Sequence, residues 1–117
     1  MTRDHNPPAC SEQGLPDLGP MTVERIAEVA KALAHPARIK IVRLFDVCRP
    51  RTVHEIVAEC ELAQSTISEH LRILREAGVV FARPDGPRMW YCLRRSVLRD
   101  FAREAEHLVS PQALSFT

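Results

Sequence analysis

The stretch that most constrains this chain covers residues 63–80 and reads AQSTISEHLRILREAGVV. Apolar residues recur at the spacing of one helical face, at Ile67, Leu71 and Leu74. This spacing predicts an amphipathic helix over 64–77, whose other face carries short polar and charged side chains. Gly78 then ends the helix, because a residue without Cβ readily adopts the left-handed conformation. A β-branched pair follows and starts an extended segment.

Three further helices are expected before this stretch, over 22–35, 36–47 and 52–60. Thr22 is predicted to be the N-cap of the first helix, and Pro36 suits the first position of the second. Thr52 and Glu55 have the spacing of a capping box at the start of the third helix. A connection of about three residues then leads into the fourth helix, which is typical of a helix-turn-helix.

A β-hairpin and a last helix are expected after the fourth helix. Two strand-like segments, Val79–Arg83 and Arg88–Arg94, flank a turn that contains Asp-Gly. Ser96 is the predicted N-cap of the last helix, which has apolar spacing as far as Leu108. Four helices, a hairpin and a last helix predict a mainly α fold with a small β-hairpin, the winged helix-turn-helix.

The 117 residues are enough for one hydrophobic core. We expect a flexible N-terminal tail over 1–20, a folded domain over 21–110 and a C-terminal tail over 111–117. No apolar run has the length of a membrane span, and the N-terminus lacks the hydrophobic segment of a signal peptide. A cytoplasmic protein without a membrane partner is predicted, and its four cysteines are expected to be reduced.

The positive charge is concentrated in the predicted helix-turn-helix and hairpin. The whole chain has a formal net charge of +1. Residues 36–99 nevertheless hold 12 Lys and Arg against 7 Asp and Glu, whereas the flanking segments are acidic. This distribution favours a nucleic-acid partner for the central region.

Three segments of the chain resemble the ArsR/SmtB repressors of bacteria and archaea. They are ALAHPAR at 32–38, QSTISEHL at 64–71 and LREAGVV at 74–80, followed by a wing that ends in Trp90-Tyr91. The resemblance covers about residues 22 to 108. It implies a homodimer through the first and last helices and repression by binding near-palindromic operator DNA. Ala63 is a departure, because the family often has serine at this position and the predicted helix then lacks its usual cap.

The fourth helix and the hairpin supply the candidate DNA contacts. Polar side chains at a helix N-terminus can reach base edges or phosphates in the major groove. We predict DNA contacts from Gln64, Ser65, Thr66, Ser68, His70, Arg72, Arg83 and Arg88. His70 has an alternative role in packing between helices, and Arg83 and Arg88 could also be solvated arginines of the turn.

The resemblance also implies release from DNA by a metal, a metalloid or a thiol-reactive signal. Cys48, just before the third helix, together with Cys10 in the tail resembles one actinobacterial-type group of arsenic repressors. These two cysteines are the candidate site for As(III) or another thiophilic metal or metalloid. Two sulfurs would also suit an organoarsenical, a reversible disulfide or a persulfide. Cys60 and Cys92 are expected to pack in the core and in a strand, respectively.

A second candidate metal site lies on the last helix, where nickel or zinc would bind. Asp100, Glu104 and His107 recur at the spacing of one helical face. The zinc and nickel sensors of the family have a different pattern there, and a solvated charged face is the alternative interpretation. A regulator without a direct ligand also remains open.

No motif predicts an enzyme. The chain has no glycine-rich phosphate loop, no nucleophile elbow and no HExxH segment. A winged helix that binds a protein partner instead of DNA is the competing hypothesis.

Overall fold

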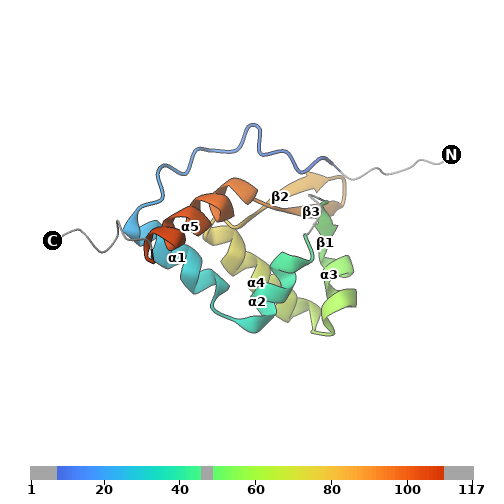
Figure 1. Ribbon diagram of the computed structural model, residues 1–117. Helices are drawn as coiled ribbons and strands as arrows, with labels where there is room; N and C mark the ends of the chain where they lie inside the picture. The colour runs from blue at the N-terminus through green and yellow to red at the C-terminus, as the bar shows by residue number, and fades with distance from the viewer. Residues whose placement is uncertain (1–7, 46–48, 110–117) are drawn as a thin grey trace.

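The computed structural model describes residues 8–45 and 49–109 (Figure 1). In chain order its elements are α1 (Val23–Leu33), α2 (Pro36–Arg43), β1 (Arg51–Thr52), α3 (Val53–Cys60), α4 (Gln64–Glu76), β2 (Val80–Asp85), β3 (Arg88–Leu93) and α5 (Arg95–His107). Five helices and a small antiparallel sheet form the predicted mainly α winged helix-turn-helix. The short strand β1 is an addition to the predicted elements.

The first two helices begin where the sequence predicts. The Thr22 hydroxyl caps α1 by accepting from the backbone N–H of Arg25 at 3.1 Å. Pro36 starts α2, and the imidazole of His35 caps that helix. The regular α-helix ends at Arg43 rather than at residue 47, so the predicted end was wrong. Tighter bonds, such as Leu44 N–H to Ile41 C=O, close the last turn there.

The helix-turn-helix consists of α3 and α4. The predicted capping box is confirmed: the Thr52 hydroxyl accepts from the Glu55 N–H at 3.2 Å, and the Glu55 carboxylate accepts from the Thr52 N–H at 3.1 Å. Glu61 ends α3 in a left-handed conformation with φ of 55°. Ala63 is the N-cap of α4 and makes no side-chain hydrogen bond.

The wing is a three-stranded antiparallel sheet in the order β1-β3-β2. Val80 pairs with Leu93, and both are buried in the main core. The next pairs, Phe81 with Cys92 and Arg83 with Trp90, lie on the opposite side of the sheet because side chains alternate along a strand. We call the side formed by Phe81, Arg83, Trp90 and Cys92 the outer face.

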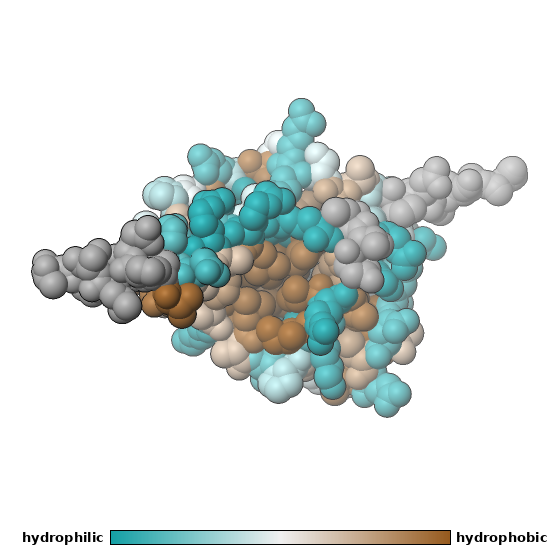
Figure 2. All heavy atoms as spheres, viewed as in Figure 1, coloured by the Kyte–Doolittle hydropathy of each residue, from teal (hydrophilic) through white to brown (hydrophobic). Residues whose placement is uncertain are grey.

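The core lies between the helices and the inner side of the sheet. Its fully buried members include Val29, Ile41, Phe45, Ile56, Ile67, Leu71, Leu74 and Val79. Hydrophobic residues also gather on the surface between α5 and the α1–α2 pair (Figure 2). At the ends of α1 and α5, Val23, Leu108 and Val109 are 77%, 69% and 75% exposed. A single chain therefore leaves apolar side chains uncovered at the start of α1 and just after the end of α5.

The start of α5 differs from the prediction. The helix begins at Arg95, and its N-cap Arg94 makes no side-chain cap. Ser96 was wrongly predicted as the cap. Its backbone N–H and its hydroxyl both donate to the carboxylate of Glu12, a residue of the N-terminal segment.

Residues 8–20, part of the segment predicted as a flexible tail, run in extended form past the wing and α5 to the start of α1 (Figure 1). They carry no helix or strand, yet they contact residues more than 70 positions away in the sequence, such as Arg83 and Arg94. Across the described residues, the helices are too short or too polar to span a bilayer.

Candidate nucleic-acid interface

The first two turns of α4 present a polar surface on a firmly held helix. Ile67 and Leu74 are 0% exposed and anchor α4 in the core. Gln64, Ser65, Thr66 and Ser68 are all exposed on its other side, where the sequence predicts DNA contacts. The buried side chains fix the orientation of α4. The opposite surface of the helix carries short polar side chains and not long, mobile ones.

The N-terminus of α4 carries backbone donors without a side-chain cap. Ala63 has the extended conformation of an N-cap, with φ of −62° and ψ of 149°, but its methyl group accepts no hydrogen bond. The first N–H groups of a helix have no partner within the helix and form the positive end of its dipole. Together these groups favour an anionic oxygen, such as that of a phosphate, at this end of α4.

His70 lies inside the protein and not at the polar surface of α4. Its side chain is 8% exposed, and its Nδ1 accepts from the Arg38 guanidinium at 3.2 Å. Arg38 also donates to the Ala32 carbonyl oxygen at 3.3 Å, and the His35 ring lies 4.8 Å from the His70 ring. The cluster joins the α1–α2 junction to α4. His70 therefore has the alternative role, packing between helices, and does not lie at the DNA-contact surface where it was predicted.

The environment of His70 favours its neutral form. Burial lowers the pKa of the imidazole, and the neighbouring His35 and Arg38 side chains lower it further, against an opposing effect of the Glu69 carboxylate. A neutral imidazole can accept from Arg38 through Nδ1, whereas a protonated one cannot. The hydrogen bond to Arg38 and the direction of the pKa shift therefore agree.

Arg72 is exposed on α4 but is held by two carboxylates of the same helix. Its guanidinium donates to Glu69 at 3.0 Å through Nε and to Glu76 at 2.6 Å through Nη1. Hydrogen bonds from Arg72 lower the pKa of Glu69. A phosphate would have to compete with both carboxylates for this guanidinium.

The two arginines of the wing have different surroundings. Arg88 is exposed beside the turn, in register with Asp85. Arg83 lies on the outer face, 5.3 Å from the centre of the Phe81 ring, and donates to the Ser11 carbonyl oxygen at 2.7 Å. Its Nη2 also donates to the Gln13 carbonyl oxygen at 3.2 Å. In this conformation Nη2 of Arg83 is bonded to the N-terminal segment, so a phosphate would have to compete with two carbonyl oxygens for this group.

Two of the cysteines form a bond that the sequence did not predict. Cys10 is joined to Cys92 of β3 by a disulfide, with the Cα atoms 5.6 Å apart. This corrects the expectation of four reduced cysteines, because β3 places Cys92 on the outer face, where the N-terminal segment crosses it. Cys48, the predicted partner of Cys10 in a thiol site, lies outside the described residues. Cys60 is a free, half-buried thiol whose pKa is raised by burial and by the Glu59 carboxylate, with Lys40 acting the other way.

The candidate metal ligands of α5 do not converge. Asp100 pairs with Arg103 at 3.0 Å, and a Glu104 oxygen lies 3.6 Å from Nδ1 of His107. Within residues 8–45 and 49–109, no three His, Cys, Asp or Glu side chains are placed to hold one metal ion. The donor set of one chain thus does not fit a zinc or nickel site on α5.

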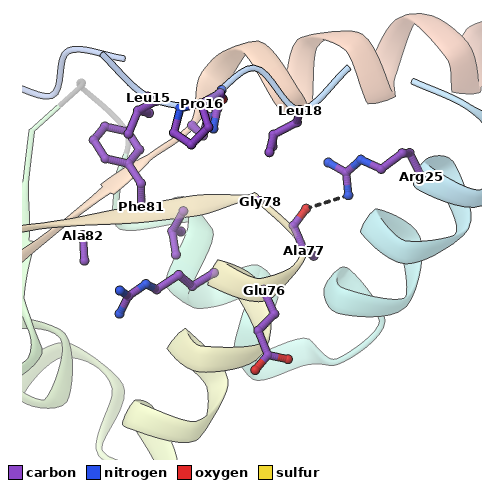
Figure 3. A pocket seen from close by; sticks show the side chains of 12 residues that line it. Leu15, Pro16, Leu18, Arg25, Glu76, Ala77, Gly78, Phe81 and Ala82 are labelled. Carbon is purple, nitrogen blue, oxygen red and sulfur yellow. Dashed lines mark hydrogen bonds between the residues drawn. The ribbon is translucent and has the colours of Figure 1, made fainter. Parts of the chain in front are cut away.

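The N-terminal segment also covers the turn between α4 and β2. A pocket of about 360 Å³ lies there, lined by Leu15, Pro16 and Phe81 among others (Figure 3). Arg25 of α1 closes one end by donating to the Ala77 carbonyl oxygen at 3.1 Å. Sequence reasoning missed this docking. The available signal was the continuous apolar run of residues 89–93 in β3 and of residues 79–82 at the start of β2, which is typical of strands covered on both sides.

Comparison with known proteins identifies the family. Residues 35–81 match the family model described as bacterial regulatory protein, arsR family. A homodimeric winged helix-turn-helix domain from Mycobacterium bovis, described as a possible ArsR-family transcriptional regulator, is 32% identical with a TM-score of 0.62. The similarity covers 71% of this chain and 77% of that one. This chain belongs to the ArsR family.

Other relatives of this ArsR-family chain are also regulators and not enzymes, as the sequence predicts. An HTH-type transcriptional regulator of Mycobacterium tuberculosis is 48% identical over 68 residues, which cover 57% of this chain and 59% of the relative. The matched region thus spans about three fifths of that relative. A crystal structure described as a possible transcriptional regulator for arsenical resistance is 31% identical, with a TM-score of 0.62, and the similarity covers 71% of this chain and 85% of that one.

Proposed function

We propose that this protein is a cytoplasmic transcriptional repressor that binds near-palindromic operator DNA as a homodimer, with α4 in the major groove. The observation that carries the proposal is the exposed polar start of α4 on a helix anchored by buried Ile67 and Leu74. The uncapped N–H groups of α4 would meet a phosphate, and Gln64 and Ser65 would reach base edges. Thr66 and Ser68 would contribute phosphate contacts.

The test is a fluorescence anisotropy titration of labelled DNA from upstream of the gene at fixed salt. Replacing Gln64 and Ser65 together by alanine should weaken binding at least tenfold while circular dichroism stays unchanged. Arg75→Ala is the control, because Arg75 is exposed near the opposite end of the same helix, about 16 Å away at 1.5 Å per residue. Binding by the double variant with unchanged affinity would exclude α4 as the reading helix. No binding of the native protein to any promoter fragment would favour the alternative, a protein-interaction module.

Arg88 of the wing is proposed to contact a phosphate next to the major groove. It is exposed beside the turn of the hairpin, and the described residues give it no ion pair shorter than 4 Å. Each lost phosphate contact reduces the slope of log K against log salt by about 0.9 on duplex DNA. A homodimer loses two such contacts, one from each protomer, so Arg88→Ala should reduce the slope by about 1.8, whereas Arg75→Ala should keep the native slope.

We propose a dimer through α1 and α5, since Val23, Leu108 and Val109 leave an uncovered apolar surface at the ends of these helices. Val23→Glu tests this interface. A carboxylate suits the first turn of a helix, so the single chain should still fold. Sedimentation should then show a shift toward monomer together with loss of DNA binding; a stable Val23→Glu dimer would exclude this part of the proposal.

The proposed effector is As(III) or another thiophilic agent that acts on cysteines, in line with the relative described for arsenical resistance. Thiolates are the ligands for such an ion. Cys10 can serve only after its bond to Cys92 is reduced, so the proposal concerns the reduced protein. Arsenite should weaken DNA binding by reduced native protein but not by Cys48→Ser. An unchanged arsenite response in Cys48→Ser would exclude the Cys10–Cys48 site.

A further inference from the structure

Three of the four side chains on the outer face of the wing, those of Phe81, Trp90 and Cys92, are buried. Phe81 is 7% exposed and Cys92 is 0% exposed, and both lie on the side of the sheet that faces away from the main core. Leu15 and Pro16 of the N-terminal segment line the same pocket as Phe81 (Figure 3). Residues 8–20 therefore cover this side of the sheet.

Polar contacts fix the position of this segment. Arg83 donates to the Ser11 and Gln13 carbonyl oxygens, and Arg94 donates to the Pro16 carbonyl oxygen at 2.7 Å. The Glu12 carboxylate accepts from the Ser96 N–H at 3.1 Å at the start of α5. These bonds hold the segment through its backbone carbonyls and the Glu12 side chain, and the Arg83 bonds occupy Nη2 of a cationic side chain of the wing.

The disulfide between Cys10 and Cys92 adds a covalent attachment at the beginning of the described segment. The two cysteines are separated by 82 positions, and no other bond joins the segment covalently to β3. Cys92 is fully buried, whereas Cys10 is partly exposed. Disulfides of cytoplasmic proteins are mostly transient and catalytic or redox-sensing. The Cys10 sulfur is thus accessible, and the oxidation state of the pair determines whether the segment is covalently attached to β3.

We propose that Cys10 and Cys92 form a thiol–disulfide exchange site for low-molecular-weight thiols and disulfides, and that its oxidation state controls docking of residues 8–20 on the outer face. Reduction releases the segment and with it Arg83. The released guanidinium then becomes available as an additional phosphate contact beside Arg88. The consequence for DNA depends on the proposed function, whereas the release of the segment does not.

The exchange is balanced with a thiol as the reductant. A thiolate attacks Sγ of Cys10, the accessible sulfur, which forms a mixed disulfide on Cys10 and breaks its bond to Cys92. The Cys92 sulfur leaves as a thiolate and takes up a proton. A second thiol attacks the mixed disulfide, which releases Cys10 as a thiol and the reductant as its own disulfide. In total the protein gains two electrons and two protons, and two reductant thiols become one disulfide.

The first measurement compares oxidised and reduced full-length protein by alkylation and mass spectrometry, followed by hydrogen exchange. We expect oxidation to protect two cysteines from alkylation, in peptides containing Cys10 and Cys92. Reduction should speed amide exchange in residues 11–16 at least tenfold, while amides of α4 stay protected. Oxidised protein with all four cysteines alkylated would overturn the proposal, and so would equal exchange of the segment in both states.

Cys10→Ser provides the variant test, because Cys10 is partly exposed and its replacement leaves the buried residues of the sheet unchanged. This variant should show fast exchange of residues 11–16 with or without reductant. Cys60→Ser is the matched control, since Cys60 is a free thiol elsewhere, and it should respond to reductant as the native chain does. A Cys10→Ser protein whose segment still responds to reductant would overturn the assignment to this pair.

DNA titrations at several salt concentrations test the role of Arg83. Reduction should steepen the salt slope by about 1.8, for one added phosphate contact from each protomer, and Arg83→Ala should remove this difference. Equal slopes for the oxidised and reduced native protein would overturn the Arg83 part of the proposal. Failure to bind DNA in either state would instead contradict the proposed function, and the exchange measurements would still decide whether the disulfide controls docking.

Discussion

The N-terminus of α4 has no side-chain cap, and adding one at position 63 tests how local structure stabilises the reading helix. Ala63 has backbone angles of φ −62° and ψ 149°, in the same extended region as Thr22 and Thr52. Those two threonines accept from a backbone N–H three residues later, at 3.1 and 3.2 Å. A threonine at position 63 should therefore accept from the N–H of Thr66 without a change of backbone.

The expected gain in the free energy of unfolding can be estimated from substitutions of capping residues in other helices. Replacing a capping residue by alanine costs about 0.5–2 kcal/mol, typically about 1 kcal/mol. Residue 63 is exposed, so a hydroxyl there loses little hydration. Ala63→Thr should therefore raise the free energy of unfolding by about 1 kcal/mol, which moves the urea midpoint by about 0.5 M for a typical slope near 2 kcal/mol/M.

Ala63→Val is the matched control, because valine has the shape of threonine without the oxygen acceptor. Both variants should be unfolded in urea at the same protein concentration, since dimer formation makes stability concentration-dependent. The difference between threonine and valine isolates the hydrogen bond from the effect of β-branching. Equal stability of the two variants would refute the reasoning, because it would mean that a side-chain acceptor at this position does not contribute to the stability of α4.

Three further outcomes are expected. Gly78→Ala should lower the urea midpoint more than Gly86→Ala, because both have positive φ but only at Gly78 would a new Cβ lie 2.8 Å from another side chain. The free energy of unfolding should fall as pH drops below about 6.5, since His70 has a lowered pKa in the folded state and the unfolded chain binds the proton first; His70→Gln should flatten this dependence in melts from pH 5 to 7. Glu76→Gln should tighten DNA binding and steepen its salt dependence, because it frees part of the Arg72 guanidinium; an unchanged salt slope would place Arg72 away from the phosphates.

The local features of the fold could be predicted because each depends on a few neighbouring residues. The capping box of Thr52 and Glu55 and the apolar spacing of Ile67 and Leu74 are properties of one helix turn or one helix face. His70 was harder to place, since its position between α1, α2 and α4 depends on Arg38, which is 32 residues away. Periodicity shows which face of a helix is apolar but not where a polar residue at its edge finds a partner.

The docking of the N-terminal segment could not be predicted from its own composition, which is rich in turn-forming residues and has no periodicity. The information lies instead in the strands that it covers. A solvent-facing wing would alternate polar with apolar residues, yet Phe81 and Cys92 are apolar on the side opposite the core. Because buried strands need a cover on both sides, such a hairpin implies a segment packed on its outer face. The cysteine in that segment then has a partner on the sheet, Cys92, and their disulfide attaches the segment to the wing.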